Sequence, residues 1–240
     1  MKISVITILI IVLGALIISS ELKSESMEVN IKPKKLSKIT AKQFVETIDS
    51  LGYFKYADKE NIQNLKQNHI ENFDSEGSWS GMWDDKTNLP LDFRYYFCDG
   101  EYVFEQDGFI GMLEKLGSIF KKIEFKIIIE NHFEEWDSEK EWLNHRITIN
   151  RTNYVIFKNF RGYGWGEVVH RFAEILNAEF EKQNIDEKIY LINGGNDGSI
   201  IFLNDKLYKF FYNTFTNPQW KPLEVKEWAK VMGIKEIKTE

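Results

Sequence analysis

Apolar residues at helical or alternating spacing divide most of the chain into short helices and strands. Thr40 precedes "AKQFVETIDSLG", so it is expected to cap a helix that closes at Gly52. A second helix is predicted over 58–72, where apolar residues again recur at helical spacing. Residues 73–90 follow no such pattern and are expected to form a long loop, and loops of that length are functional or mobile.

Three pairs of apolar runs, each interrupted by turn residues, predict β-hairpins. The hairpins cover residues 91–106, 143–160 and 188–203. In the first, Asp99 and Gly100 supply a two-residue turn that requires positive φ. Counting outward from this turn places Arg94 opposite Glu105 on the face away from the core.

Helical spacing returns between and after the hairpins. Further helices are predicted over 109–121, 165–183, 205–214 and 223–231, and a further strand over 123–129. Mixed strand pairs and helices favour a single α+β domain over 40–240, with a mixed, largely antiparallel sheet packed by several helices.

The strands expected at 154–160 and 188–193 flank the helix at 165–183, and together they predict a β-α-β unit. If the two strands are parallel neighbours, the loops that follow them leave from one edge of the sheet. That edge would be the place where a ligand or partner binds.

The amino-terminal segment gives the most specific signal in the chain. Residues 3–18 form an uncharged apolar run after Lys2, shorter than the roughly 20 residues that a membrane span needs. We therefore expect 1–20 to be a signal peptide or an uncleaved membrane anchor, followed by a polar tether over 21–39. The domain is accordingly expected to be exported to the periplasm, anchored at the membrane through this segment alone, or secreted.

Composition narrows the choice of partners and chemistry. The formal net charge of the 240 residues is −6, which argues against binding to nucleic acid. Hydrophobic residues make up 43% of the chain, enough to fill a large core. A single cysteine excludes an internal disulfide and a zinc site built from several thiolates.

A glycine-rich segment between a predicted strand and helix raises the question of phosphate binding. Gly162, Gly164 and Gly166 are spaced differently from a dinucleotide-binding loop, in which the third glycine follows three residues after the second. Glu167 stands where that glycine belongs, and its charge near a helix amino terminus would repel phosphate. The pattern favours an ordinary turn.

Two further motifs fail at specific positions. "NGGNDGSIIFLN", residues 193–204, resembles part of a calcium-binding loop, but Asn204 stands where a bidentate glutamate belongs and strands flank it. "GSWSG", residues 77–81, has the outer glycines of a serine-hydrolase turn but carries Trp79 at the nucleophile position.

The four histidines, His69, His132, His145 and His170, show no metal-ligand spacing along the chain. We therefore expect neither a metal site nor a cofactor. His145 alternates with the apolar Leu143 and Ile147 and is expected to face the core as a hydrogen-bonded histidine rather than as a ligand.

Because each catalytic motif fails, the sequence favours a non-catalytic domain that binds another protein, with an inhibitor-like or immunity-like role. The alternative is an envelope hydrolase that acts on glycan or peptide. The candidate binding residues are Trp79 and Trp83 in the loop at 73–90, and Arg161, Tyr163, Asn196 and Asp197 in the two glycine-rich loops.

Overall fold

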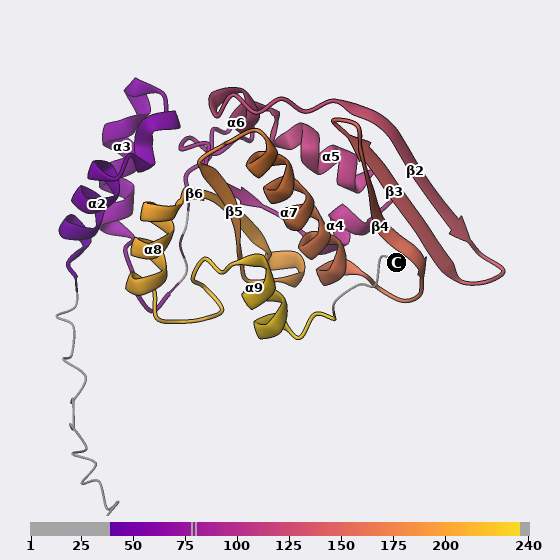
Figure 1. Cartoon of the computed structure of the whole chain (residues 1–240). Helices are drawn as coiled ribbons and strands as arrows, with labels where there is room; N and C mark the ends of the chain where they lie inside the picture. Colours follow the sequence, from indigo (N-terminus) through magenta and orange to yellow (C-terminus); the bar gives the residue numbers. More distant parts are fainter. Residues whose placement is uncertain (1–38, 78, 80, 236–240) are drawn as a thin grey trace, which may run out of the picture. The chain divides into compact units, whose positions relative to one another are not determined.

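The computed structural model describes residues 39–77, 79 and 81–235 (Figure 1). Within these residues the chain forms helices and two antiparallel three-stranded sheets, which confirms the predicted α+β class. The predicted signal or anchor segment at 1–20 and the tether up to residue 38 lie outside the described residues. None of the helices in the described part combines the length and the apolarity of a membrane span.

The elements follow one another in mixed order. The helices are α2 (Ala41–Ser50), α3 (Ile62–Glu71), α4 (Gly100–Phe104), α5 (Gly108–Lys115), α6 (Gly117–Lys122), α7 (Trp165–Lys182), α8 (Asp205–Thr214) and α9 (Val225–Met232). The strands are β1 (Tyr95–Phe97), β2 (Ile129–Asp137), β3 (Trp142–Ile149), β4 (Thr152–Phe160), β5 (Glu187–Ile192) and β6 (Ser199–Asn204). Short 3-10 turns are η1 (Tyr53–Tyr56), η2 (Lys59–Asn61) and η3 (Gly195–Asp197).

The sheet β1-β6-β5, here called the central sheet, is covered on both faces. Tyr190 and Ile201 face a core shared with α2, α3 and α8, while Ile189 and Phe202 face a second core that includes α7. Because neighbouring residues of a strand point to opposite faces, burial on both sides requires continuous apolar runs, at 189–192 in β5 and at 200–203 in β6.

The sheet β2-β3-β4, here called the outer sheet, packs one face against the second core. Its β3–β4 pair confirms the hairpin predicted over 143–160, and β5–β6 confirms the one over 188–203. Asn150 and Arg151 form the tight turn between β3 and β4, and both have positive φ as such turns require. In Figure 1, α7 lies between the two sheets.

The hairpin predicted over 91–106 is wrong. Only Tyr95–Phe97 form a strand, β1, and it pairs with β6 instead of with residues that follow it. Asp99 caps helix α4 by accepting a hydrogen bond from the Glu101 backbone, and Gly100 is the first helical residue without positive φ. An Asp-Gly pair can begin a helix as well as form a turn. Here it begins α4, which buries Val103 in the core.

Three smaller predictions also need correction. The strand predicted over 123–129 is wrong: Glu124 has positive φ and β2 begins only at Ile129. The helix predicted over 109–121 is divided at Leu116 into α5 and α6. The parallel β-α-β unit is wrong because β4 and β5 belong to different sheets, each strand pairing with its hairpin partner.

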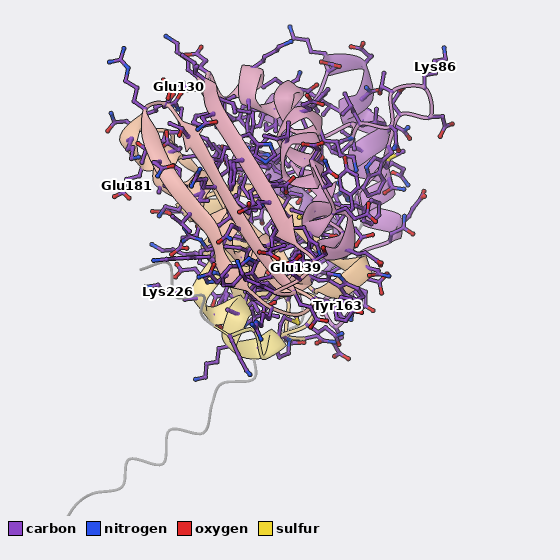
Figure 2. The ribbon with its side chains drawn as sticks, turned by 90° about the vertical axis from the view of Figure 1, so that its right-hand side faces the viewer. Lys86, Glu130, Glu139, Tyr163, Glu181 and Lys226 are labelled. Carbon is purple, nitrogen blue, oxygen red and sulfur yellow. The ribbon has the colours of Figure 1, made fainter. Side chains whose placement is uncertain are left out.

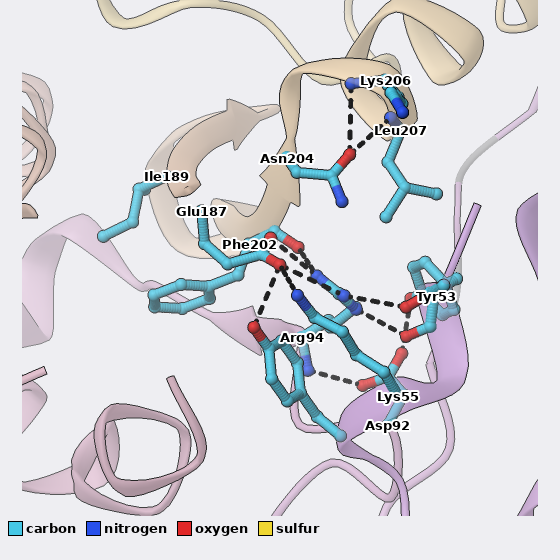
Figure 3. Close-up of polar contacts among 12 residues, drawn as sticks. Tyr53, Lys55, Asp92, Arg94, Glu187, Ile189, Phe202, Asn204, Lys206 and Leu207 are labelled. Atoms are coloured by element: carbon cyan, nitrogen blue, oxygen red, sulfur yellow. Dashed lines mark hydrogen bonds and ion pairs between the residues drawn. The ribbon is translucent and has the colours of Figure 1, made fainter. Parts of the chain in front are cut away.

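A buried guanidinium joins the central sheet to the turn after α2 (Figure 3). Arg94 is completely buried and donates to the Glu187 carboxylate at 2.9 Å, to the Phe202 carbonyl at 2.6 Å and to the Tyr53 carbonyl at 2.6 Å. Burial alone would raise the pKa of Glu187, but the charge and hydrogen bonds of Arg94, together with those of Lys55, outweigh burial and bring that pKa below its ordinary value. Glu187, not Glu105, is therefore the partner of Arg94.

Replacing Arg94 with alanine should lower the free energy of unfolding by about 3–5 kcal/mol, because it leaves the Glu187 charge buried without its main partner. Urea unfolding measures this loss. The control is Lys188→Ala, which removes an ion pair with Asp205 whose side chains are 54% and 66% exposed, and should cost about 1 kcal/mol or less. Equal losses in the two variants would contradict this account of the network.

Gly100 is needed for close packing and not for a turn. A Cβ added there would lie 2.7 Å from the Trp165 carbonyl oxygen, whereas a Cβ at Gly117 would meet no atom within 4 Å. Gly100→Ala should therefore lower the melting temperature, and Gly117→Ala should leave stability unchanged or raise it by about 0.5–1 kcal/mol. Thermal unfolding of both variants checks this, and a destabilised Gly117→Ala with an unaffected Gly100→Ala would refute it.

Candidate functional site

The inner face of the outer sheet carries a cluster of polar side chains. Glu134 on β2 lies directly opposite His145 on β3, and His132 precedes Glu134 by two residues, so all three point to the same face. The Nε2 atoms of His132 and His145 are 3.0 Å apart. Oε1 of Glu134 lies 3.3 Å from Nδ1 of His145, and its Oε2 lies 3.9 Å from Nε2 of His132.

Asp107, just before α5, adds a second carboxylate to the cluster. Its backbone N–H donates to Oε2 of Glu134 at 2.8 Å, and its Oδ1 lies 3.7 Å from Nδ1 of His132. Asp107 occupies the N-cap position of α5 but its side chain makes no capping hydrogen bond, and its φ is +61°. Nine other non-glycine residues in the described part of the chain also have positive φ, so this conformation alone does not mark a site.

Burial shifts the pKa of the two central groups. His145 is 2% exposed and packs edge-on against Phe109, and burial, with the nearby His132, lowers its pKa to about 3. The prediction that His145 faces the core is confirmed. Burial also raises the pKa of Glu134. A neutral His145 offers a nitrogen lone pair, and one ligand atom from each of His132, Glu134 and His145 lies within 4.8 Å of the others. These three residues could hold a metal ion.

A cavity of about 420 Å³ opens beside the cluster. Glu134 lines it together with Phe104, Gln106, Trp136 and Leu143. Aromatic and aliphatic walls with a single carboxylate are typical of sites that bind a ligand and fix its orientation with a few polar groups.

The outer sheet also presents a free edge. Strand β2 has β3 as its only neighbour in the described sheet and runs for nine residues, most of them exposed. The apolar side chains of Ile128 and Trp136, at its two ends, are 62% and 56% exposed. Figure 2 faces this sheet, with Glu130 near one end of its strands and Glu139 near the other. The segment 129–141 carries six carboxylates and one lysine.

The four binding candidates in the glycine-rich loops lie on the surface. Tyr163 is 85% exposed, and Arg161, Asn196 and Asp197 are exposed as well. The two loops do not share a sheet edge, because β4 and β5 lie in different sheets. Figure 2 shows Tyr163 near the same end of the outer sheet as Glu139. Binding by these four residues stays a prediction.

Of the two tryptophan candidates, Trp79 is not a surface anchor of its loop, whereas binding by Trp83 stays a prediction. Trp79 is only 4% exposed and stacks on His69 in the core, with ring centroids 4.3 Å apart. Trp83 is half-buried and stacks on the exposed Phe97 of β1 at 4.7 Å. The ring of Trp79 supports the fold, because it finds aromatic partners within the core.

Sequence reasoning missed the His132–Glu134–His145 cluster because its members meet across strands. Strand β2 itself was not predicted, since its charged residues obscure an alternation that places His132, Glu134 and Trp136 on one face. The alternating His-x-Glu-x-Trp pattern could have indicated the strand. The opposing position of His145 depends on the register, which the spacing of residues along the chain does not give.

Comparisons with protein-family models, with curated proteins and with solved structures each found no match to this chain. The function must therefore be argued from the geometry of the site alone.

Proposed function

We propose that this protein is an exported, non-catalytic domain that binds an extended, basic segment of another protein along the edge of β2. The nine-residue edge, exposed and rich in carboxylates, is the observation that carries the proposal. An unpaired strand edge presents backbone N–H and C=O groups that a partner strand can bind. An inhibitor-like or immunity-like role is consistent with this mode of recognition.

The charge of the edge supports a basic partner. Glu130, Glu135, Asp137 and Glu139 all lie on β2 or in the turn after it. Like charges repel, so this edge resists pairing with a second copy of the same acidic chain. A segment rich in lysine or arginine is attracted to it, and that attraction accelerates association and fixes the register.

Strand β2 is favoured over the other edge, β4, for two reasons. The Arg171 guanidinium of α7 donates to the Val155 carbonyl of β4 at 2.7 Å, so part of that edge already has a partner. The edge of β2 also ends at Trp136, which is 56% exposed and lines the cavity. Exposed tryptophans are common among the residues that dominate binding energy, and they attract cationic side chains.

Synthetic peptides that alternate valine with lysine should bind the full chain, and matched peptides that alternate valine with glutamate should not. Fluorescence anisotropy measures affinity, and hydrogen exchange should show added protection at 129–137. Trp136→Ala and Glu135→Lys should each weaken binding of the lysine peptide about tenfold or more, equivalent to about 1.4 kcal/mol or more.

Two variants serve as controls for the peptide experiment. Phe97→Ala removes an aromatic ring that is also 56% exposed but lies on β1, and Asp85→Lys reverses an exposed charge in the loop before it. Both should bind the lysine peptide as the unaltered chain does. Equal binding of the two peptides, or protection confined to other strands, would rule the proposal out.

The export part of the proposal rests on the apolar run at 3–18. A fusion of residues 1–40 to a reporter that is active only outside the cytoplasm should be active. The control is the same fusion with two arginines replacing Leu9 and Ile10, which should be inactive because charges in the apolar run prevent insertion. Activity in the control, or none in the unaltered fusion, would remove this part.

A further inference from the structure

We propose that His132, Glu134 and His145 bind a zinc ion at the inner end of the cavity beside Trp136. The site goes beyond peptide binding at the edge, because its ligands point to the opposite face of β2 from Glu135. Two imidazole nitrogens and one carboxylate oxygen form a donor set that zinc accepts.

Two of the three separations between ligand atoms fit such an ion with little movement, and all three lie within 4.8 Å. Zinc–nitrogen bonds of about 2.0–2.1 Å place two ligand nitrogens about 2.9 Å apart at a right angle and about 3.4 Å apart at the tetrahedral angle. The observed separation of the two Nε2 atoms is 3.0 Å. Oε2 of Glu134, 3.9 Å from Nε2 of His132, needs to approach by about half an ångström, a small adjustment for a flexible side chain.

A carboxylate behind His132 favours Nε2 of that ring as the ligand atom. Oδ1 of Asp107 lies 3.7 Å from Nδ1 of His132, which favours a proton on Nδ1 and leaves the lone pair on Nε2, the usual arrangement behind metal-binding histidines. Nε2 of His132 faces Nε2 of His145 at 3.0 Å, and a cation between them would take a lone pair from each.

The surroundings hold the ligands in place and leave one side open. His145 is fixed between Phe109 and Phe157, with ring centroids at 5.6 and 6.4 Å. Glu134 lines the cavity, which gives the ion a path of entry and room for a water molecule. Three protein ligands leave one position open for a water molecule or another ligand, unlike closed structural sites with four protein ligands.

Titration calorimetry of the full chain, first treated with a chelator, should show one zinc ion bound per chain. Cobalt(II), used as a spectroscopic probe, should give a visible absorption band that zinc abolishes. His132→Gln should weaken zinc binding at least a hundredfold, and Glu134→Gln or Asp107→Asn about tenfold to a hundredfold. Zinc at a hundred times its Kd should raise the melting temperature by about 5–10 °C.

Two matched variants separate this site from adventitious binding. Glu135→Gln removes the neighbouring carboxylate on the other face of β2, and His69→Phe removes a buried histidine in the other core. Both should bind zinc within about twofold of the unaltered chain. His132 is partly exposed, so His132→Gln keeps the test valid if a His145 variant does not fold.

Zinc binding that His132→Gln leaves unchanged would overturn the proposal. So would an equal loss in Glu135→Gln and Glu134→Gln, because it would place the ion on the acidic edge. Failure of the chelator-treated chain to bind zinc or cobalt would overturn it directly. None of these outcomes depends on whether peptides bind to the edge of β2.

Discussion

The buried guanidinium of Arg94 is the interaction on which the central sheet depends. Its Nε and both Nη atoms donate to carbonyls or to the Glu187 carboxylate, so the charge is hydrogen-bonded on every side. A buried charge that loses a partner is costly, and each group around Arg94 must therefore stay in position. The turn after α2, the carbonyl of Phe202 on β6 and the start of β5 are all fixed by this one side chain.

The outer sheet lies at the far side of α7 from this network and is held differently. Its inner face contributes Ile147, Ile149 and Phe157 to the second core, so burial of apolar surface fixes it near its middle and at the β3–β4 turn. Toward the other end this apolar packing gives way to Trp136 and the cavity. The candidate sites thus lie where the core stops, and polar groups there can face a ligand without unfolding the sheet.

Local patterns in the sequence identified the elements that have regular hydrophobic spacing and that contact residues nearby in the chain. Helices α2, α7 and α8 and the hairpins β3–β4 and β5–β6 are of this kind, since each pairs or packs with residues nearby in the chain. Strand β1 could not be predicted as a partner of β6, because about a hundred residues separate Tyr95 from Ile201. The same limit applies to Arg94 and Glu187, which are 93 residues apart. His132 and His145 are only 13 residues apart, and their proximity depends on the β2–β3 register, which the spacing of residues along the chain does not give.

Strand β2 brings the two proposed sites together while keeping them chemically distinct. Side chains alternate along a strand, so Glu134 faces His145 and the cavity, whereas Glu135 faces the opposite side. Peptide addition at the edge uses backbone groups that lie in the plane of the sheet, between these two directions. Neighbouring glutamates therefore report on different functions: Glu135 on attraction of a basic segment, and Glu134 on coordination of a metal. The face of β2 on which a residue lies decides which proposed site it belongs to. A shift of the β2–β3 register by one residue would therefore separate the three proposed metal ligands, while the edge of β2 would still be free to pair with a peptide.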